Sequence, residues 1–242
     1  RVRPFNYPAL LNNKGQLEFM KPDTIHKRSI TLKRKSPLIR KAFTAALRLK
    51  HSKFQATHKE DFSDAVTVYS FEEYSVSGSV NVSDTTKYRY WRYICPLPYR
   101  CNIAKLMFFG NNNQKLTGTI IGPKERKDPN CGRSFAFDMD PLTVFSSKPL
   151  TNGWVGMDFR EPTSVKRISY MTRNDDNNIR VGDEYELFYW DMNWISLGKQ
   201  TATDFTLTFN LVPQNTLLIL RNHTRGKDER IFLYKNGQQI WY

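Results

Sequence analysis

Short stretches in which apolar and polar residues alternate recur along this chain, and they constrain its fold more than any other feature. In the clearest stretch, 205–209, Phe and Leu alternate with Thr. A period of two places one set of side chains on the buried face of a sheet and the other set in solvent. A second stretch, 185–190, is rich in aromatic residues, which favour a pleated surface. The sequence therefore predicts an all-β fold.

Turn-forming residues separate these stretches at 111–113, 128–130, 152–153 and 236–237. Residues 38–47 are the one stretch whose apolar residues have a spacing typical of a helix. However, Leu47 and Leu49 also alternate with Arg48 and Lys50. This alternation predicts that the end of the segment is a strand.

The order of strand types repeats along the chain. Each half has a basic strand, a strand that leads into a polar turn, an Arg-bearing apolar strand and a closing strand before an Asn/Gly turn. The closing strands are 104–109 in the first half and 229–234 in the second. Because the order is preserved, the sequence predicts two tandem antiparallel β-sandwich domains, a degenerate basic one over 1–112 and another over 113–242. The alternative is a chance likeness among generic strands.

The formal charge of +14 is concentrated in the N-terminal quarter of the chain. Residues 1–53 hold fourteen Lys and Arg but only two acids, Glu18 and Asp23. Such a surface attracts nucleic acid, anionic glycan or an acidic neighbouring domain, or it is simply a solvated face. No helix-turn-helix, zinc-finger or single-strand-binding signature accompanies the charge, so we expect no nucleic-acid partner. No apolar run approaches the roughly 18 residues of a membrane span, so we expect none.

The residues that carry enzyme chemistry stand in no recognisable pattern. Three cysteines, Cys95, Cys101 and Cys131, are too few for a disulfide framework or a zinc site, although Cys95 and Cys101 could meet across a short turn. The four histidines lie in no local signature of a Cys–His nucleophilic pair. No nucleotide-binding glycine loop or zinc-protease helix occurs. We therefore expect no catalytic residues and no enzymatic activity.

Three segments of the second half, 136–143, 154–159 and 185–189, resemble discoidin, or coagulation-factor C-type, domains in their residues and their order. The stretch 88–242 is also similar to the C-terminal region of secreted transglutaminase-like proteins of gut anaerobic bacteria. The resemblance implies a jelly-roll-like, galactose-binding-like sandwich that binds ligands at loops on one end. It also implies an extracellular, periplasmic or cell-surface location, and an upstream catalytic domain as a candidate partner.

In domains of this family, the segment that corresponds to 136–143 often holds a structural calcium ion. The resemblance implies Asp138, Asp140 and Thr143 as its ligands here, with Glu229 of the closing strand supplying another oxygen. Carboxylate, hydroxyl and carbonyl oxygens are the ligands that a hard cation such as Ca²⁺ prefers. The alternative is that these are turn and capping residues.

One residue departs from the family's pattern at this calcium site. The family commonly has Gly where this chain has Met139, and Gly gives the backbone of such a turn its freedom. The position in the first half that is equivalent to Glu229 is Lys105, so we expect no calcium in the first half.

The candidate ligand-binding residues lie on two loops and a turn: Arg173, Asn174, Asp175, Arg225 and Trp194. The Arg, Asn and Asp side chains offer the planar or bidentate hydrogen bonding that a sugar needs, and Trp194 offers an apolar platform. Trp154 and Trp190 lie in strand patterns that are more typical of a core. Alternatively, the charged loop residues brace the loops internally.

These observations predict a non-catalytic accessory module that binds carbohydrate or a cell-surface glycan. The alternative is a structural module that packs against an upstream domain, with the basic N-terminal segment as its docking surface. A large exposed apolar patch on the first 80 residues would favour the second function, because monomers rarely expose one without a partner.

Overall fold

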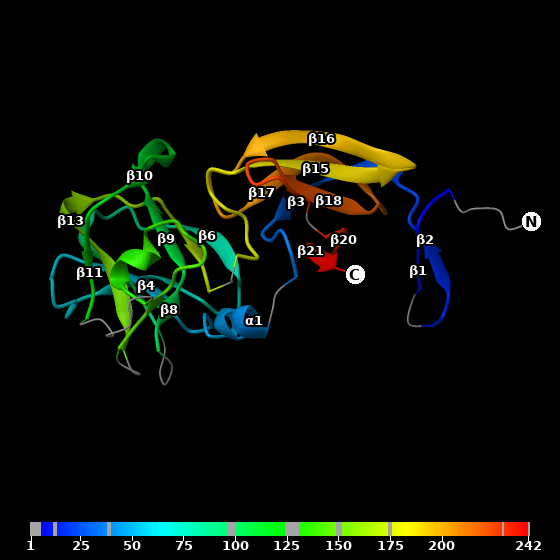
Figure 1. Cartoon of the computed structure of the whole chain (residues 1–242). Helices are drawn as coiled ribbons and strands as arrows, with labels where there is room; N and C mark the ends of the chain where they lie inside the picture. Colours follow the sequence, from blue (N-terminus) through cyan, green and yellow to red (C-terminus); the bar gives the residue numbers. More distant parts are fainter. Residues whose placement is uncertain are drawn as a thin grey trace, which may run out of the picture. The chain divides into compact units, whose positions relative to one another are not determined.

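The computed structural model describes residues 6–11, 14–37, 40–95, 100–123, 131–148, 152–173, 176–228 and 230–241. The chain forms an all-β fold with several antiparallel sheets and one short helix (Figure 1). It divides into two compact units. We call Leu38–Asn178 the inserted unit, and Arg1–Pro37 together with Ile179–Tyr242 the split unit.

The inserted unit is built on two main antiparallel sheets. The five-stranded sheet has the order β11-β13-β7-β4-β5, with β4 (Lys53–Thr57), β5 (Val66–Ser70), β7 (Tyr88–Ile94), β11 (Thr119–Ile121) and β13 (Trp154–Thr163). The four-stranded sheet has the order β10-β9-β14-β6, with β6 (Ser77–Asn81), β9 (Lys105–Phe109), β10 (Lys115–Leu116) and β14 (Arg167–Met171). The smaller elements are α1 (Arg40–Leu47), the pair β8 (Asn102–Ile103) and β12 (Phe145–Ser146), and the 3-10 turns η1 (Asn111–Asn113) and η2 (Arg133–Ala136).

Side chains from both sheets share one core in the inserted unit. Phe54 of β4 and Trp91 of β7 are buried on one side, and Phe108 of β9 and Ile168 of β14 on the other. The ring centroids of Trp91 and Phe108 lie 6.4 Å apart, edge to face. Two sheets that bury their apolar faces against each other make this unit β-sandwich-like.

The split unit is built on a six-stranded sheet with the order β16-β15-β18-β20-β21, in which β19 also pairs with β18. Its strands are β15 (Glu184–Asp191), β16 (Asn193–Thr201), β18 (Leu218–Asn222), β19 (Lys227–Asp228), β20 (Phe232–Lys235) and β21 (Gln238–Trp241). Two further strand pairs complete the unit: β3 (Asp23–Leu32) with β17 (Leu207–Gln214), and β1 (Ala9–Leu11) with β2 (Leu17–Phe19).

The core of the split unit confirms the alternation in the sequence. Leu207 and Phe209 of β17 are buried, whereas Thr208 between them is exposed. The two buried residues pack in one cluster with Ile30 of β3 and Leu187 of β15. The cluster therefore joins the β3–β17 pair to the larger sheet.

The two units differ from the tandem domains 1–112 and 113–242 that the repeat predicts. β9 pairs with β14, and β7 pairs with β13, across that boundary. β3, near the start of the chain, pairs with β17, near its end. A repeated order of strand types leaves open which strands pair, because pairing is decided by long-range burial of the apolar faces.

The strand predicted at 47–50 also differs from the structure. α1 ends at Leu47, residues 48–51 form a turn, and β4 begins at Lys53. Leu49 is buried and its backbone N–H donates to the carbonyl of Ala46 over 3.1 Å, which continues the helical turn. The apparent alternation of Leu47 and Leu49 therefore reflects the end of a helix.

Candidate functional site

The structure does not bring the predicted ligand-binding residues into one site within either unit. Arg173 belongs to the inserted unit, whereas Arg225 and Trp194 belong to the split unit. Asn174 and Asp175 lie outside the described residues.

Arg225 stabilises its own loop through hydrogen bonds to Asp183 and Asn222. Its Nε donates to Oδ2 of Asp183 over 2.8 Å, and its backbone N–H donates to Oδ1 of Asn222 over 3.1 Å. The Nδ2 of Asn222 donates to the same Asp183 oxygen over 2.7 Å. Asp183 is only 4% exposed, so these contacts tie the loop after β18 to the start of β15. This geometry favours the internal bracing that was the alternative to a ligand-binding role.

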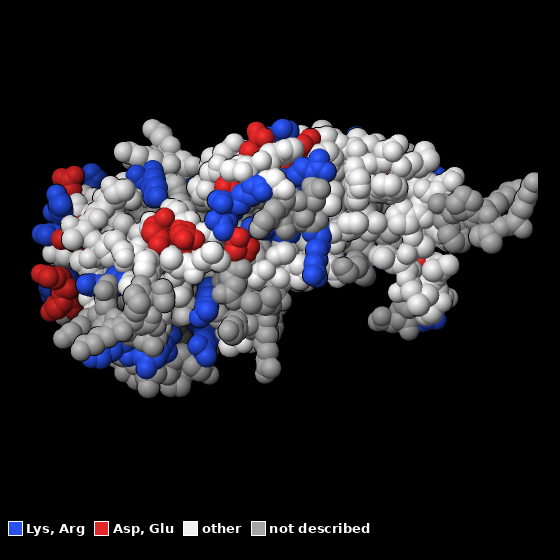
Figure 2. All heavy atoms as spheres, in the orientation of Figure 1, with Lys and Arg blue, Asp and Glu red and all other residues white. Residues whose placement is uncertain are grey.

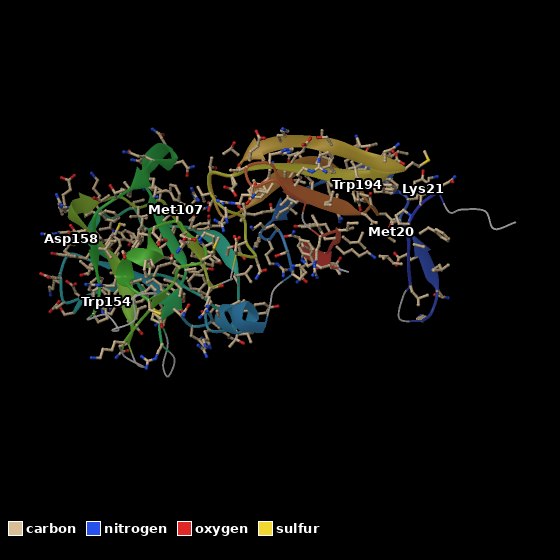
Figure 3. All side chains as sticks on the ribbon, viewed as in Figure 1. Met20, Lys21, Met107, Trp154, Asp158 and Trp194 are labelled. Carbon is tan, nitrogen blue, oxygen red and sulfur yellow. A yellow bond between two sulfur atoms is a disulfide. The ribbon has the colours of Figure 1, made fainter. Side chains whose placement is uncertain are left out.

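Trp194 lies beside the turn that joins β15 to β16, where Figure 3 labels it. It stands opposite Trp190 across the two strands, and the ring centroids lie 5.2 Å apart, edge to face. Both rings are half-buried. An aromatic pair across a hairpin stabilises the strand pairing, which accounts for Trp194 without a ligand.

The residues implied as calcium ligands do come together, except that Glu229 lies outside the described residues. The hydroxyl of Thr143 donates to Oδ2 of Asp138 over 2.8 Å and to the carbonyl of Asp140 over 2.9 Å. The N–H of Asp140 donates to Oδ1 of Asp138 over 3.0 Å. Within the described part of the chain, no group of three or more His, Cys, Asp or Glu side chains is placed to hold a metal ion.

The cation among these oxygens is the ammonium group of Lys105. Its Nζ lies 2.9 Å from Oδ1 of Asp138 and 2.9 Å from Oγ1 of Thr143, and its side chain is 1% exposed. Burial lowers the pKa of Lys105 below its ordinary value, and the Asp138 carboxylate opposes that shift. Met139 has φ of +64°, so this turn does adopt the left-handed conformation for which the family uses Gly.

A cavity in the split unit brings together groups that the sequence does not associate. Its volume is about 310 Å³, at the lower end of the range for small-ligand sites. It is lined by residues from β3, from the end of β17 and the segment after it, and from β20 and the turn after it: Asp23, Arg28, Gln214, Asn215, Thr216, Leu233, Tyr234, Lys235 and Asn236.

Tyr234 and Arg28 form the centre of this lining. The guanidinium carbon of Arg28 lies 5.4 Å from the centroid of the Tyr234 ring, and its Nη2 donates to the Tyr234 carbonyl. The Nε of Arg28 is buried and has no hydrogen-bond partner among the residues that the structure describes. A buried N–H without an acceptor is costly, and either a water molecule or a ligand could satisfy it.

Three polar side chains of the lining are held in place by backbone groups or by an ion pair. The Nδ2 of Asn215 donates to the carbonyl of Lys21 over 3.0 Å. The carboxylate of Asp23 accepts the backbone N–H of His26 over 2.9 Å, and this hydrogen bond lowers the pKa of Asp23. The Nζ of Lys235 lies 3.3 Å from Oε1 of Glu18. The lining thus combines fixed amides and charges with one aromatic ring.

On the one face drawn in Figure 2, the described basic side chains do not form one continuous field. On the face drawn in Figure 2, Lys and Arg lie in several separate groups, with acidic side chains beside some of them. On β3, Lys27 is exposed and Arg28 is half-buried, while Lys35 after the strand is buried. Some basic residues of the N-terminal segment are therefore buried or half-buried in the split unit.

Exposed apolar side chains occur on the β1–β2 hairpin. Leu11, Leu17 and Phe19 are 70%, 54% and 42% exposed. The two strands pair with each other and with no other described strand. An isolated two-stranded hairpin is marginally stable in water, so this element lacks the support that a third strand or a partner would give.

Comparisons with models of protein families, with curated proteins and with solved structures found no match for this chain. The structure shows a mostly β protein with antiparallel sheets and a β-sandwich-like architecture. Cys95 and Cys101 form a disulfide, which is typical of oxidising compartments. No helix among the described residues is long and apolar enough to span a membrane.

Sequence reasoning missed the cavity because its two central residues are far apart in the chain. Arg28 belongs to the N-terminal basic run, and Tyr234 belongs to a closing strand whose pattern indicates only a buried β element. The turn signal at 236–237 was the one local indication of a loop at this position. Nothing in the spacing connects the two segments.

Proposed function

We propose that this chain is a non-catalytic glycan-binding module and that its ligand site is the cavity around Arg28 and Tyr234. One observation supports it most directly. The buried Nε of Arg28 has no acceptor, although Arg28 lines a cavity with an aromatic ring and several amide groups.

The chemistry of a sugar suits this lining. A sugar presents hydroxyl groups around its edge and apolar C–H faces, so its sites combine planar hydrogen-bonding side chains with an aromatic surface. Asn236 offers an amide that both donates and accepts, Asn215 offers its amide oxygen, and Arg28 offers N–H donors only. Lys235 is already paired with Glu18, so the guanidinium group of Arg28 is the charge that favours a sugar with a carboxylate or sulfate.

The proposal includes a location outside the cytoplasm, at the cell surface, in the periplasm or in the medium. The Cys95–Cys101 disulfide supports it, because such bonds persist in oxidising compartments. The chain would then deliver a binding function beside a catalytic domain of the same or another protein.

A second function, packing against another protein domain, is favoured by the β1–β2 hairpin. Its exposed Leu11, Leu17 and Phe19 lie within the first 80 residues, where an apolar surface favours docking. A wide hollow of about 580 Å³ beside β1 is lined by Tyr7, Leu17 and Trp190, among other residues. The hollow and the Arg28 cavity share no lining residue, although Glu18 of β2 pairs with Lys235 of the cavity.

The test is a glycan-array screen of the purified chain with neutral and acidic glycans, followed by titration calorimetry with the best glycan. Arg28→Ala is expected to weaken binding roughly tenfold or more, because a hydrogen bond from a charged group contributes about 1.5–3 kcal/mol. Lys27→Ala is the matched control, since Lys27 is the exposed neighbour on the same strand and does not line the cavity.

Two further results separate the alternatives. Full binding by Arg28→Ala, with an unchanged circular dichroism spectrum, would move the site away from this cavity. No binding across the array would favour the docking function. If docking is the function, a Leu11→Ser, Leu17→Ser, Phe19→Ser variant should no longer bind the protein partner. If glycan binding is the function, the same variant should bind the sugar like the wild type.

A further inference from the structure

We propose that the ammonium group of Lys105 is a built-in cation that replaces a metal ion in the loop between η2 and β12, so that this loop closes without metal. The inference concerns the inserted unit and is independent of the glycan site in the split unit. It departs from the calcium ion that the family resemblance implies, because a lysine stands where such an ion would be held.

The first argument is the oxygen shell around Nζ. Three backbone carbonyls lie within 3.1 Å of it: Ala104 at 2.7 Å, Phe135 at 2.6 Å and Thr143 at 3.1 Å. The hydroxyl of Thr143 and the carboxylate of Asp138 each lie at 2.9 Å. Carbonyl, hydroxyl and carboxylate oxygens are the ligand types of a hard cation.

The second argument is the number of acceptors. An ammonium group has three N–H donors, yet five oxygens surround Nζ at hydrogen-bonding distance. A shell with more acceptors than donors suits a spherical charge, which every oxygen can face at once. The loop is therefore arranged as a coordination shell, and Lys105 supplies the charge at its centre.

The third argument is charge balance. Asp138 is the carboxylate in contact with Nζ, so the pair is neutral. The Oδ1 of the nearby Asp140 accepts the N–H of Leu142 over 3.0 Å and serves the turn. A divalent ion at the same oxygens would lie beside the ammonium group and be repelled strongly in this buried position. Lys105 and a metal ion are therefore mutually exclusive.

The fourth argument is where Lys105 is anchored. It is the first residue of β9, which pairs with β14 and with β10 in the four-stranded sheet, and all of β9 is buried. Its side chain joins this sheet to the carbonyl of Phe135 in η2 and to Thr143 before β12. A metal ion would make the same connection but would leave when chelated, whereas a covalently attached cation cannot leave.

The experiment measures thermal unfolding of the full chain in excess chelator and in millimolar calcium chloride. The wild-type midpoint should be the same in both solutions. Lys105→Ala empties the centre of the shell, so its midpoint in chelator should fall by about 10 °C, because the carbonyls of Ala104, Phe135 and Thr143 lose their donor and Asp138 loses its ion pair. Calcium should return at least half of that loss.

Lys105→Met is the matched control, because its side chain fills the space without a charge. Its midpoint should be lowered equally in both solutions. If Lys105→Ala does not fold in chelator, Lys105→Glu, which adds a carboxylate ligand, is refolded with and without calcium, and folding only with calcium supports the proposal. A calcium-dependent rise of the wild-type midpoint would overturn the proposal. So would a Lys105→Ala or Lys105→Glu chain that does not respond to calcium.

Discussion

Asp158 shows how single residues in the inserted unit combine charge with backbone geometry. Arg89 donates to it from Nε over 2.8 Å and from Nη2 over 2.9 Å. The N–H of Arg160, whose φ is +67°, donates to the same carboxylate over 2.7 Å. Asp158, labelled in Figure 3, therefore holds the irregular part of β13, where its register with β7 shifts.

Stability should depend on pH through Asp158. The Arg89 hydrogen bond holds the pKa of Asp158 below its ordinary value of 3.8, and the Arg160 N–H adds to this shift. The unfolded chain then binds a proton more readily than the folded chain, so the carboxylate stabilises the fold above that ordinary value. This contribution is lost as pH falls through the lower folded pKa.

Asp158→Asn should therefore be less stable than the wild type at neutral pH, and the difference should shrink as pH falls below about 4. Urea midpoints of both proteins between neutral pH and pH about 3 measure this. A difference that stays constant over that range would mean that the carboxylate charge is not responsible.

At the scale of elements, the contact between β7 and β13 depends on a residue without a side chain. A Cβ on Gly156 would lie 2.0 Å from the carbonyl oxygen of Trp91 and 2.9 Å from Cα of Arg92. Both contacts are to backbone atoms of the paired strand, so no side-chain rotation relieves them. Gly156 is thus required by the close approach of the two strands.

Gly156→Ala should destabilise the inserted unit by roughly 3 kcal/mol or more, because the β7–β13 pairing must separate to admit a methyl group. Calorimetry of the full chain measures the loss, and the transition of the split unit serves as the internal control. An unfolding enthalpy and midpoint equal to the wild type would show that the strands are not held this closely.

Local patterns predicted which residues form strands, since the period of two is a property of neighbouring residues. The alternation of buried Leu207 and Phe209 with exposed Thr208 is an example. The same patterns could not predict that β3 pairs with β17, because that choice depends on burial over the whole chain. The strand order within the sheets could not be predicted from the sequence for the same reason.

The candidate sites, too, were predictable from the sequence only where their residues are close in the chain. Asp138, Asp140 and Thr143 are close in sequence, and the structure places them in hydrogen-bonding contact with one another. The position of Lys105 among their oxygens follows from the pairing of β9 in the sheet, which no spacing reveals. The cavity at Arg28 and Tyr234 likewise required the fold.

At the scale of the whole molecule, the inserted unit is one continuous segment with its own core and the Cys95–Cys101 disulfide. A fragment Leu38–Asn178 should therefore fold alone, since the split unit contributes no residue to that core. The fragment should unfold in one cooperative transition, with a midpoint close to that of the same unit in the full chain. A fragment without cooperative unfolding would show that the two units stabilise each other.

The division of the split unit has a consequence for synthesis on the ribosome. β3 leaves the ribosome before the inserted unit, but β17, its partner, is made only after the entire inserted unit. At a synthesis rate of about 5–20 residues per second, the apolar side chains of Ile30 and Leu32 remain exposed for roughly ten seconds or more. The inserted unit can fold during that interval. Like charges on Lys27, Arg28 and Lys33 repel the same segment of neighbouring nascent chains, which disfavours aggregation of the unpaired strand until β17 is made.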